Sequence, residues 1–397
     1  MQSQQTTEPA QADSNGCADE LTRLRSEIDA VDAKIVTLLA ERARLARAVG
    51  KAKAQIAASG TTGDAPKSSN IYRPERERAV IERAIVKGAQ CDSLISSESL
   101  AAIYGEIISA CRAVEARPSV AYLGPQGTFT EMAVLEQFGS SVDLNPCQTI
   151  DATFHAVESG TVQFAVVPVE NSTQGTVTRT MDLLLATPLT VIGEVSVAVR
   201  HNLMNQSGNI ADVEEVCAHP QALAQCRNWL TAHLPNVRIT SASSNAEAAV
   251  MASKNPKLAA IAATRAADLY GLSILAPAIQ DNPCNTTRFW VLGTQPAGRA
   301  AGIAAKTAVI FSVPNRAGSL FEALEPLERH GVSMARLESR PARNGAWDYN
   351  FYVDLEGHRE DEAVARALAE MRAKTSYFKV LGSFPADASG PGKRKQA

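Results

Sequence analysis

Residues 21–53 read LTRLRSEIDAVDAKIVTLLAERARLARAVGKAK, and their apolar side chains follow a helical period. The side chains recur at intervals of three, four and seven, at Leu21, Leu24, Ile28, Val31, Ile35, Leu38, Leu45 and Val49. This spacing predicts one long amphipathic helix that continues to Ile56. A Gly/Ser/Thr-rich break at 59–70 follows it. Two more helices are predicted near 74–88 and 97–115, so we expect residues 19–117 to form an all-α domain.

Two differently patterned regions come after this helical segment. From Ser119 to about Gly293, short apolar runs alternate with segments long enough for helices, which is typical of an open α/β sheet. The candidate strands are 120–123, 164–169, 191–199, 215–218, 259–262 and 288–292. Beyond an Ala/Gly linker at 297–305, the predicted order is strand, helix, strand, strand, helix, strand, at 307–313, 319–330, 333–340, 347–355, 360–374 and 378–384. This order is that of the ferredoxin-like α+β unit.

The composition of the 397-residue chain excludes several classes of function. Apolar residues make up 45% and charged residues 20%, and the net charge of -3 gives no sign of a nucleic-acid or anionic-membrane partner. The seven cysteines are scattered, and no C-x-x-C, H-x-x-x-H or Gly-rich nucleotide motif occurs, so we expect neither a metal nor another cofactor. Residues 1–18 do not resemble a signal peptide, and no apolar run nears the roughly 20 residues that cross a membrane. We therefore expect a cytoplasmic protein with small-molecule ligands.

Three cations, Arg25, Arg42 and Lys53, lie on or at the end of the long predicted helix. Arg42 and Lys53 return to nearly the same face about 16 Å apart, so their side chains can converge on one ligand. Arg25 lies about 25 Å before Arg42 along the axis, too far to share a small ligand with Lys53 of its own chain. If Arg25 belongs to the site, it must come from an antiparallel second copy. The alternative is that all three are ordinary solvent-exposed charges.

The segment 21–53, followed by YRPERE and EIISACRAVE, resembles the all-helical chorismate mutase family over residues 19–117. The resemblance implies an intertwined helical dimer that binds chorismate, a dicarboxylate, through cations of both subunits. Carried over by position, the pocket residues are Arg25, Arg42, Lys53, Arg76, Glu77, Cys111 and Glu115, with Lys53 and Glu115 as the catalytic pair. This Claisen rearrangement needs no nucleophile, only a substrate held in its reactive shape and charge stabilised on the ether oxygen.

Two positions depart from the pattern of some family members. Glu115 stands where some have Gln, and a carboxyl group donates a hydrogen bond to the ether oxygen only when protonated. We therefore predict that mutase activity falls as pH rises. Arg73 stands where some have an aspartate, which leaves the contact to the substrate's ring hydroxyl open.

Small or hydroxyl-bearing turns follow three predicted strands of the middle region, within VAYLGPQGTFTE (120–131), FAVVPVENSTQGTVTRT (164–180) and VCAHPQALAQC (216–226). Helix N-termini present unpaired N–H groups and partial positive charge, so such turns suit anions. The capping box that begins at Thr128 is equally what a plain helix start requires. Three such turns in one domain favour a carboxylate-binding cleft.

GPQGTFTE, VVPVENSTQGTV, HPQALAQC and NTTRFWVLG together resemble the prephenate dehydratase family across residues 119–293. The resemblance implies two subdomains around a cleft, similar to type II periplasmic binding proteins. The implied site residues are Thr128, Asn171, Ser172, Thr173, Gln225, Thr287, Arg288 and Phe289. Prephenate loses its carboxylate and ring hydroxyl together, which requires a proton donor at the hydroxyl. We assign Thr287 to that hydroxyl and Arg288 to orientation, by holding the NTTRF turn.

The segment VPNRAGSLFEALEPLERHGVSMARLESRP (313–341) resembles the ACT regulatory domain attached to prephenate dehydratases. The resemblance implies that phenylalanine binds at an interface between chains, to Asn315, Ala317, Gly318, Ser319, Leu320, Glu338, Ser339, Arg340 and Pro341. Gly318 leaves the backbone free for close approach to an amino acid at a helix start. The alternative is a purely structural dimerisation module.

The expected fold class is multidomain, in three parts between two disordered tails, at 1–18 and 386–397. An all-α intertwined mutase domain (19–117) is followed by an α/β two-subdomain cleft (119–295) and an α+β ferredoxin-like ACT domain (304–385). We expect a homodimer or higher homo-oligomer that converts chorismate to prephenate and prephenate to phenylpyruvate, with feedback inhibition by phenylalanine. Two alternatives stay open: a non-catalytic amino-acid sensor, and an arogenate-preferring dehydratase with a decayed mutase domain.

Overall fold

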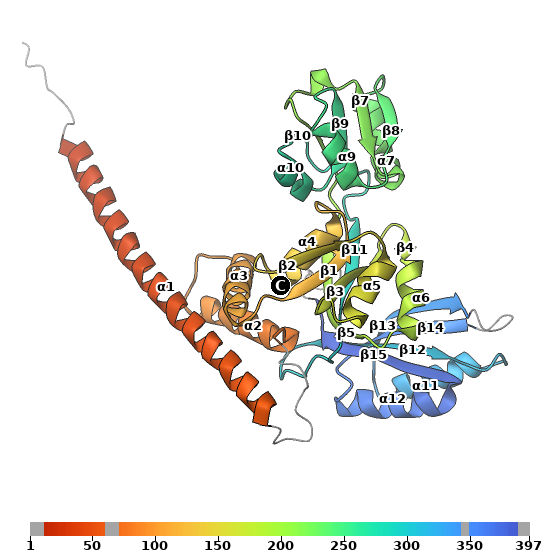
Figure 1. The fold of residues 1–397 in the computed structure, drawn as a ribbon. Coiled ribbons are helices and arrows are strands. Elements are labelled where there is room, and N and C mark those ends of the chain that lie inside the picture. The colour runs from red at the N-terminus through yellow and green to blue at the C-terminus, as the bar shows by residue number, and fades with distance from the viewer. Residues whose placement is uncertain (1–11, 60–70, 343–348, 388–397) are drawn as a thin grey trace, which may run out of the picture.

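The structure of the protein, a computed structural model, describes residues 12–59, 71–342 and 349–387 (Figure 1). Residues 1–11 of the predicted N-terminal tail, 60–70 of the predicted break and 388–397 of the predicted C-terminal tail lie outside the described residues. Among the described helices, none combines the length and apolar character needed to cross a bilayer.

The first region is helical, as predicted, and consists of α1 (Ala12–Ser59), α2 (Pro74–Gln90) and α3 (Ser97–Glu115). Helix α1 begins before Asp19, so residues 12–18, expected to be a disordered tail, are helical; their sequence has one glycine and no proline to stop the helix. The apolar row of α1 is exposed in the single chain: Ile28 is 59% and Leu38 63% accessible. Figure 1 shows the N-terminal half of α1 running away from the other elements.

The middle region forms two lobes, each with its own sheet. The first lobe contains β1 (Ser119–Leu123), α4 (Phe129–Phe138), β2 (Asp143–Cys147), α5 (Ile150–Glu158), β3 (Phe164–Asn171), β4 (Gly175–Thr176), α6 (Thr178–Ala186), β5 (Thr190–Ala198) and β11 (Thr286–Gly293). Its sheet has the order β2-β1-β3-β11-β5, with β4 paired to β3. The chain leaves this lobe after β5 and returns in β11, so two crossings join the lobes (Figure 1).

The chain segment between these two crossings forms the second lobe. It contains β6 (Asn202–Asn205), a short 3-10 helix (Ile210–Asp212), β7 (Glu215–Ala218), α7 (Pro220–Gln225), α8 (Arg227–His233), β8 (Arg238–Ser241), α9 (Asn245–Ala252), β9 (Leu258–Ala262), α10 (Thr264–Tyr270) and β10 (Ser273–Ala276). The sheet order is β10-β6-β9-β7-β8. The predicted strands of both lobes are present, whereas β2, β4, β6, β8 and β10 were not predicted.

The last region has the predicted order of a ferredoxin-like unit. Its elements are β12 (Ala305–Ser312), α11 (Ser319–Arg329), β13 (Met334–Pro341), β14 (Tyr349–Glu356), α12 (Glu362–Lys374) and β15 (Tyr377–Pro385), and the sheet order is β13-β14-β12-β15. One face of this sheet carries α11 and α12, and the other shares a core with the first lobe, where Trp290 packs near Phe384. A Cβ on Gly382 would lie 2.0 Å from the carbonyl oxygen of Val191, so this contact between β15 and β5 requires glycine.

Candidate functional site

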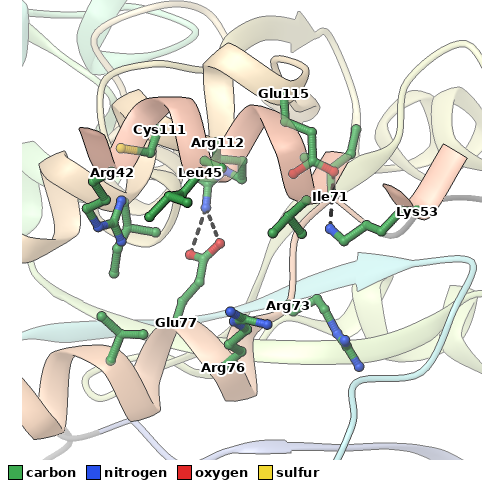
Figure 2. Close-up of a pocket in the computed structure, with 14 residues that line it drawn as sticks. Arg42, Leu45, Lys53, Ile71, Arg73, Arg76, Glu77, Cys111, Arg112 and Glu115 are labelled. Atoms are coloured by element: carbon green, nitrogen blue, oxygen red, sulfur yellow. Dashed lines mark hydrogen bonds and ion pairs between the residues drawn. The ribbon is translucent and has the colours of Figure 1, made fainter. Parts of the chain in front are cut away.

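A cavity of about 270 Å³ lies between α1, α2 and α3 (Figure 2). All of the predicted mutase residues except Arg25 line it. The lining side chains are Arg42, Leu45, Ala46, Val49, Lys53, Ile71, Arg73, Arg76, Glu77, Val80, Ile108, Cys111, Arg112 and Glu115. Cations dominate the polar part of this wall, so the cavity suits an anionic small molecule.

Lys53 and Glu115 meet at one end of the cavity. Lys53 Nζ lies 3.1 Å from Glu115 Oε1, and both side chains remain partly open to solvent. A Cβ on Gly50 would lie 2.6 Å from Cγ of Glu115, so glycine at this position lets α1 approach α3 closely. Arg42, which precedes Lys53 on α1, donates a hydrogen bond of 3.3 Å to the carbonyl oxygen of Ile107. The predicted convergence of Arg42 and Lys53 on one cavity is therefore present.

Arg112, which was not predicted, fixes the opposite wall. Its Nη1 lies 2.5 and 2.7 Å from the two carboxylate oxygens of Glu77, and its Nη2 donates to the carbonyl oxygen of Phe138 at the end of α4. The guanidinium also lies over the ring of Tyr72, 5.4 Å from its centroid. Burial raises the pKa of Glu77, and Arg112 opposes that effect. Arg112 shares a helix face with Ile108 and Glu115, a spacing of three and four that could have revealed it.

Arg25 and Arg73 differ from the other cations near this cavity. Arg25 is exposed on α1 and does not line the cavity of its own chain. Arg73 lines the cavity, but its side chain is 52% accessible and its Nε lies 3.2 Å from Glu75 Oε1.

A cleft of about 1070 Å³ separates the two lobes of the middle region. From the first lobe it is lined by the loop before α4 and by Thr287 and Phe289 of β11, and from the second lobe by residues at the starts of α7 and α9. Thr128 caps α4 and Ser244 caps α9, each accepting a backbone N–H. Among the described residues that line this cleft there is no lysine or arginine, so the free N–H groups of helix starts are its main electropositive feature.

A chain of buried amides leads to Thr287. Asn171 Nδ2 donates to Thr287 Oγ1 at 2.8 Å and to Asn285 Oδ1 at 2.9 Å. Asn285 donates in turn to Gln225 Oε1, which lies 2.9 Å from His201 Nε2. The backbone N–H groups of residues 173 and 174 both donate to Asn171 Oδ1, which fixes the orientation of that amide. Thr287 Oγ therefore accepts from Asn171, and its own hydrogen is left to point into the cleft.

The other predicted dehydratase residues support this turn without lining the cleft. Ser172 Oγ accepts from the backbone N–H of Thr286, Thr173 donates its N–H to Asn171, and Gln225 holds Asn285. Asn285 and His201 were not predicted as site residues, although Asn285 begins the quoted NTTRF motif.

Arg288 corrects an expectation, because its side chain is not in the cleft. Successive side chains of a strand point to opposite faces, so Arg288 lies on the face of β11 away from Thr287 and Phe289. Its guanidinium lies 5.4 Å from the ring centroid of Trp290, and Arg288 Nη2 lies 2.6 Å from Asp354 Oδ2 of the last region. Arg288 therefore does not line the cleft, and its assigned role in orienting the turn stays a prediction.

The predicted phenylalanine residues fall into two groups in the single chain. A cavity of about 710 Å³ between α6 and the last sheet is lined by Arg340 and Pro341, but not by residues 315–320. Arg340 donates to the carbonyl oxygen of Thr178 at 2.7 Å. Gly318, the N-cap of α11, has a φ of 85°, which favours glycine.

Comparisons with known proteins match three successive regions of the chain. Family models match residues 24–116 (chorismate mutase type II), 120–297 (prephenate dehydratase) and 307–373 (ACT domain). The chain is 41% identical to the bifunctional chorismate mutase/prephenate dehydratase of Aquifex aeolicus, over 92% of this chain and 98% of that one. A prephenate dehydratase structure from Arthrobacter aurescens, in complex with L-Phe, is 34% identical with a TM-score of 0.63, covering 69% of this chain and 91% of that one. A structure titled GqqA, a novel type of quorum-quenching acylase, is 32% identical with a TM-score of 0.63, covering 68% and 98%.

The helical cation-lined pocket, the two-lobed cleft and the ferredoxin-like unit define a multidomain enzyme with two separate small-molecule sites. The chain belongs to the family of bifunctional chorismate mutase/prephenate dehydratases. No group of three or more His, Cys, Asp or Glu suited to a metal ion occurs in the part of the chain that the structure describes.

Proposed function

We propose that this chain converts chorismate to prephenate in the helical pocket and prephenate to phenylpyruvate in the two-lobed cleft, under feedback inhibition by phenylalanine. The observation that carries the proposal is the presence, on one chain, of a cation-lined cavity and of a cleft into which Thr287 points. We also propose that residues 19–117, 119–295 and 304–385 are the units that carry the three activities, and that the protein is cytoplasmic.

In the helical pocket, the residues suit an intramolecular rearrangement. Chorismate carries two carboxylates, and guanidinium groups such as those of Arg42 and Arg76 bind carboxylates in a bidentate way. Lys53 lies at one end, where its ammonium group can stabilise negative charge on the ether oxygen as the bond to carbon breaks. Glu115, beside it, can donate a hydrogen bond to that oxygen when it is protonated. Glu77, held by Arg112, can accept a hydrogen bond from the ring hydroxyl of the substrate.

The exposed row on α1 supports an intertwined dimer. A 48-residue helix with many exposed large apolar side chains has more apolar surface than a soluble monomer usually leaves open. A second, antiparallel copy would cover this row and bring its Arg25 to the pocket that contains Lys53. Mixing Arg25→Ala and Lys53→Ala chains tests this arrangement, because half of the randomly formed dimers are mixed and each mixed dimer has one intact site out of two. We expect about a quarter of wild-type mutase activity from the mixture and almost none from either variant alone.

In the cleft, Thr287 is the proposed partner of the leaving hydroxyl. Prephenate releases carbon dioxide as the electrons of its ring carboxylate move into the ring, and the hydroxyl leaves as water after receiving a proton. Asn171 donates to Thr287 Oγ, which makes the threonine O–H a better donor toward that hydroxyl. The second carboxylate, on the pyruvyl side chain, is proposed to bind the free N–H groups at the starts of α4 and α9.

Phenylalanine is proposed to bind at an interface between ACT domains, with residues 315–320 of one chain and 338–341 of another. In the single chain, residues 315–320 do not line the cavity that Arg340 and Pro341 line, which supports a site completed by a second copy.

A coupled assay tests the proposed function as a whole. Full-length protein is supplied with chorismate, and prephenate and phenylpyruvate are measured over time with and without phenylalanine. We expect both products in sequence and less phenylpyruvate when phenylalanine is present. A non-catalytic sensor would form neither product. Substituting arogenate for prephenate distinguishes the arogenate-preferring alternative.

A further inference from the structure

Six charged side chains form a network at the boundary between the dehydratase sheet and the ACT sheet. The dehydratase sheet contributes Glu170 (β3), Glu194 (β5) and Arg288 (β11), and the ACT sheet contributes Lys306 (β12), Arg336 (β13) and Asp354 (β14). We call these residues the boundary network. Each sheet thus supplies one residue from each of three strands.

The two sheets are joined by direct ion pairs within the boundary network. Arg288 Nη2 lies 2.6 Å from Asp354 Oδ2, and Lys306 Nζ lies 2.6 Å from Glu194 Oε1. Arg336 Nε lies 3.2 Å from Glu170 Oε2. Arg288 also lies 3.2 Å from Glu194, within its own sheet.

The boundary network is balanced in charge, and its members are largely shielded from water except for Glu170, whose side chain is 38% accessible. It holds three anions and three cations, and the side chains of Glu194 and Asp354 are each only 1% accessible. Burial alone would lower the pKa of Arg288, but Asp354, Glu194 and Glu170 outweigh it and raise the pKa. A shielded ion pair that loses one partner leaves the other charge uncompensated, so these contacts restrict how the two sheets can move against each other.

Two members of the boundary network are sequence neighbours of the proposed dehydratase site. Arg288 precedes Phe289 and follows Thr287, whose side chain lies on the cleft face of β11. Glu170 precedes Asn171, the residue that donates to Thr287 Oγ1. The pairing of β11 with β3 shifts register between Arg288 and Phe289, so the ladder between these two strands is irregular at this point.

The ACT members of the boundary network are close to the proposed phenylalanine residues. Arg336 and Asp354 are paired across β13 and β14, and Arg336 lies on the same strand as Glu338 and Arg340. A shift of β13 on ligand binding would therefore move Arg336 against Glu170. A shift of β14 would move Asp354 against Arg288.

We propose that Arg288 and Glu170 are positioning residues of the dehydratase site, that Asp354 and Arg336 hold them, and that the boundary network transmits phenylalanine binding to Thr287. This inference rests on the proposed function. In this proposal Arg288 acts from the face of the dehydratase sheet that contacts the ACT sheet. The ACT domain then helps to orient the turn that carries Thr287.

The test compares Arg336→Gln, Glu170→Gln and the double variant in the full-length chain. Arg329→Gln is the matched control, because Arg329 is also ion-paired on the ACT domain, to Glu325 and Glu370, but lies outside the boundary network. For each protein, dehydratase kcat and KM, inhibition by phenylalanine, and mutase rate are measured.

We expect each network variant to lower dehydratase kcat about 10-fold with little change in KM, since small misplacements of a catalytic group have effects of this order. The phenylalanine concentration for half-inhibition should rise about 10-fold. The double variant should lose no more than either single variant, mutase rate should stay at the wild-type value, and Arg336→Lys should recover most of the loss.

Two results would overturn the inference: Arg336→Gln behaving like Arg329→Gln, or inhibition by phenylalanine staying unchanged. Mutase and dehydratase activities that fall together would indicate general unfolding of the variant. If Arg336→Gln folds poorly, Arg336→Lys decides alone, because a loss as large as that of Glu170→Gln contradicts a role for the charge. A wild-type chain that forms no phenylpyruvate would instead refute the proposed function, so the two failures are distinct.

Discussion

Replacing Asn171 by aspartate reverses one hydrogen bond and tests how Thr287 is activated. Asn171 now donates to Thr287 Oγ1 over 2.8 Å, while its Oδ1 accepts two backbone N–H groups. In Asn171→Asp the carboxylate can still accept those N–H groups, so the turn should keep its shape. The second carboxylate oxygen, however, can only accept from Thr287, which draws the hydroxyl hydrogen away from the cleft.

The expected loss of dehydratase activity follows from the effect of removing one hydrogen-bond donor that points at the reacting group. Removing such a donor costs on the order of 10²- to 10³-fold in kcat, or about 3–4 kcal/mol of transition-state stabilisation. We expect dehydratase kcat to fall about 100-fold in Asn171→Asp, with the mutase rate unchanged. The ratio of variant to wild-type kcat should rise again as pH falls toward about 4, because a protonated carboxyl can donate to Thr287.

Asn282→Asp is the matched control, since Asn282 is exposed in the segment that leads into β11 and undergoes the same change of charge. Steady-state assays of phenylpyruvate formation from prephenate, at several pH values, measure the effect. The reasoning is refuted if Asn171→Asp keeps the kcat of Asn282→Asp, or if mutase activity falls to the same extent.

Three further predictions concern the mutase pocket and pH. Arg112→Met should lower mutase kcat roughly 10-fold, and adding Glu77→Gln should cost little more, because in a double-mutant cycle residues acting through one contact are not additive. Glu115→Gln should flatten a mutase pH profile that otherwise falls as pH rises; an unchanged profile contradicts the assigned donor role. Burial lowers the pKa of His201, so the unfolded chain binds its proton first, and the free energy of unfolding should fall as pH drops below about 6.5. His201→Gln should reduce that slope, by up to about 1.4 kcal/mol per pH unit, in denaturant titrations; an equal slope rules out this contribution.

The sequence predicted those elements whose apolar pattern is strong. The helix at 97–115 and the strand at 215–218 have the predicted bounds, because helical and strand periods are clear there. The strands that were missed are short or polar. For example, β2 reads DLNPC, with a proline that demotes any strand prediction, and only its partner β1 makes it a strand.

For the candidate sites, sequence reasoning found cavity walls better than the contacts behind them. The helical period brought Arg42 and Lys53 to one cavity, but the pairing of Arg112 with Glu77 joins two helices and has no local signal of its own. Strand alternation separates Arg288 from Thr287, so this pattern, applied in full, would have placed Arg288 opposite the cleft. What no pattern could supply is the docking of the ACT sheet on that face, because it depends on the packing of two separate domains.

The most direct test of two independent sites on one chain is a time course with chorismate, comparing wild-type protein with Thr287→Ala. We predict that both proteins consume chorismate at the same rate, that wild type accumulates phenylpyruvate, and that Thr287→Ala accumulates prephenate with phenylpyruvate formation reduced at least about 100-fold. Equal loss of chorismate consumption and phenylpyruvate formation, or undiminished phenylpyruvate formation by the variant, would contradict the assignment of the two reactions to separate sites.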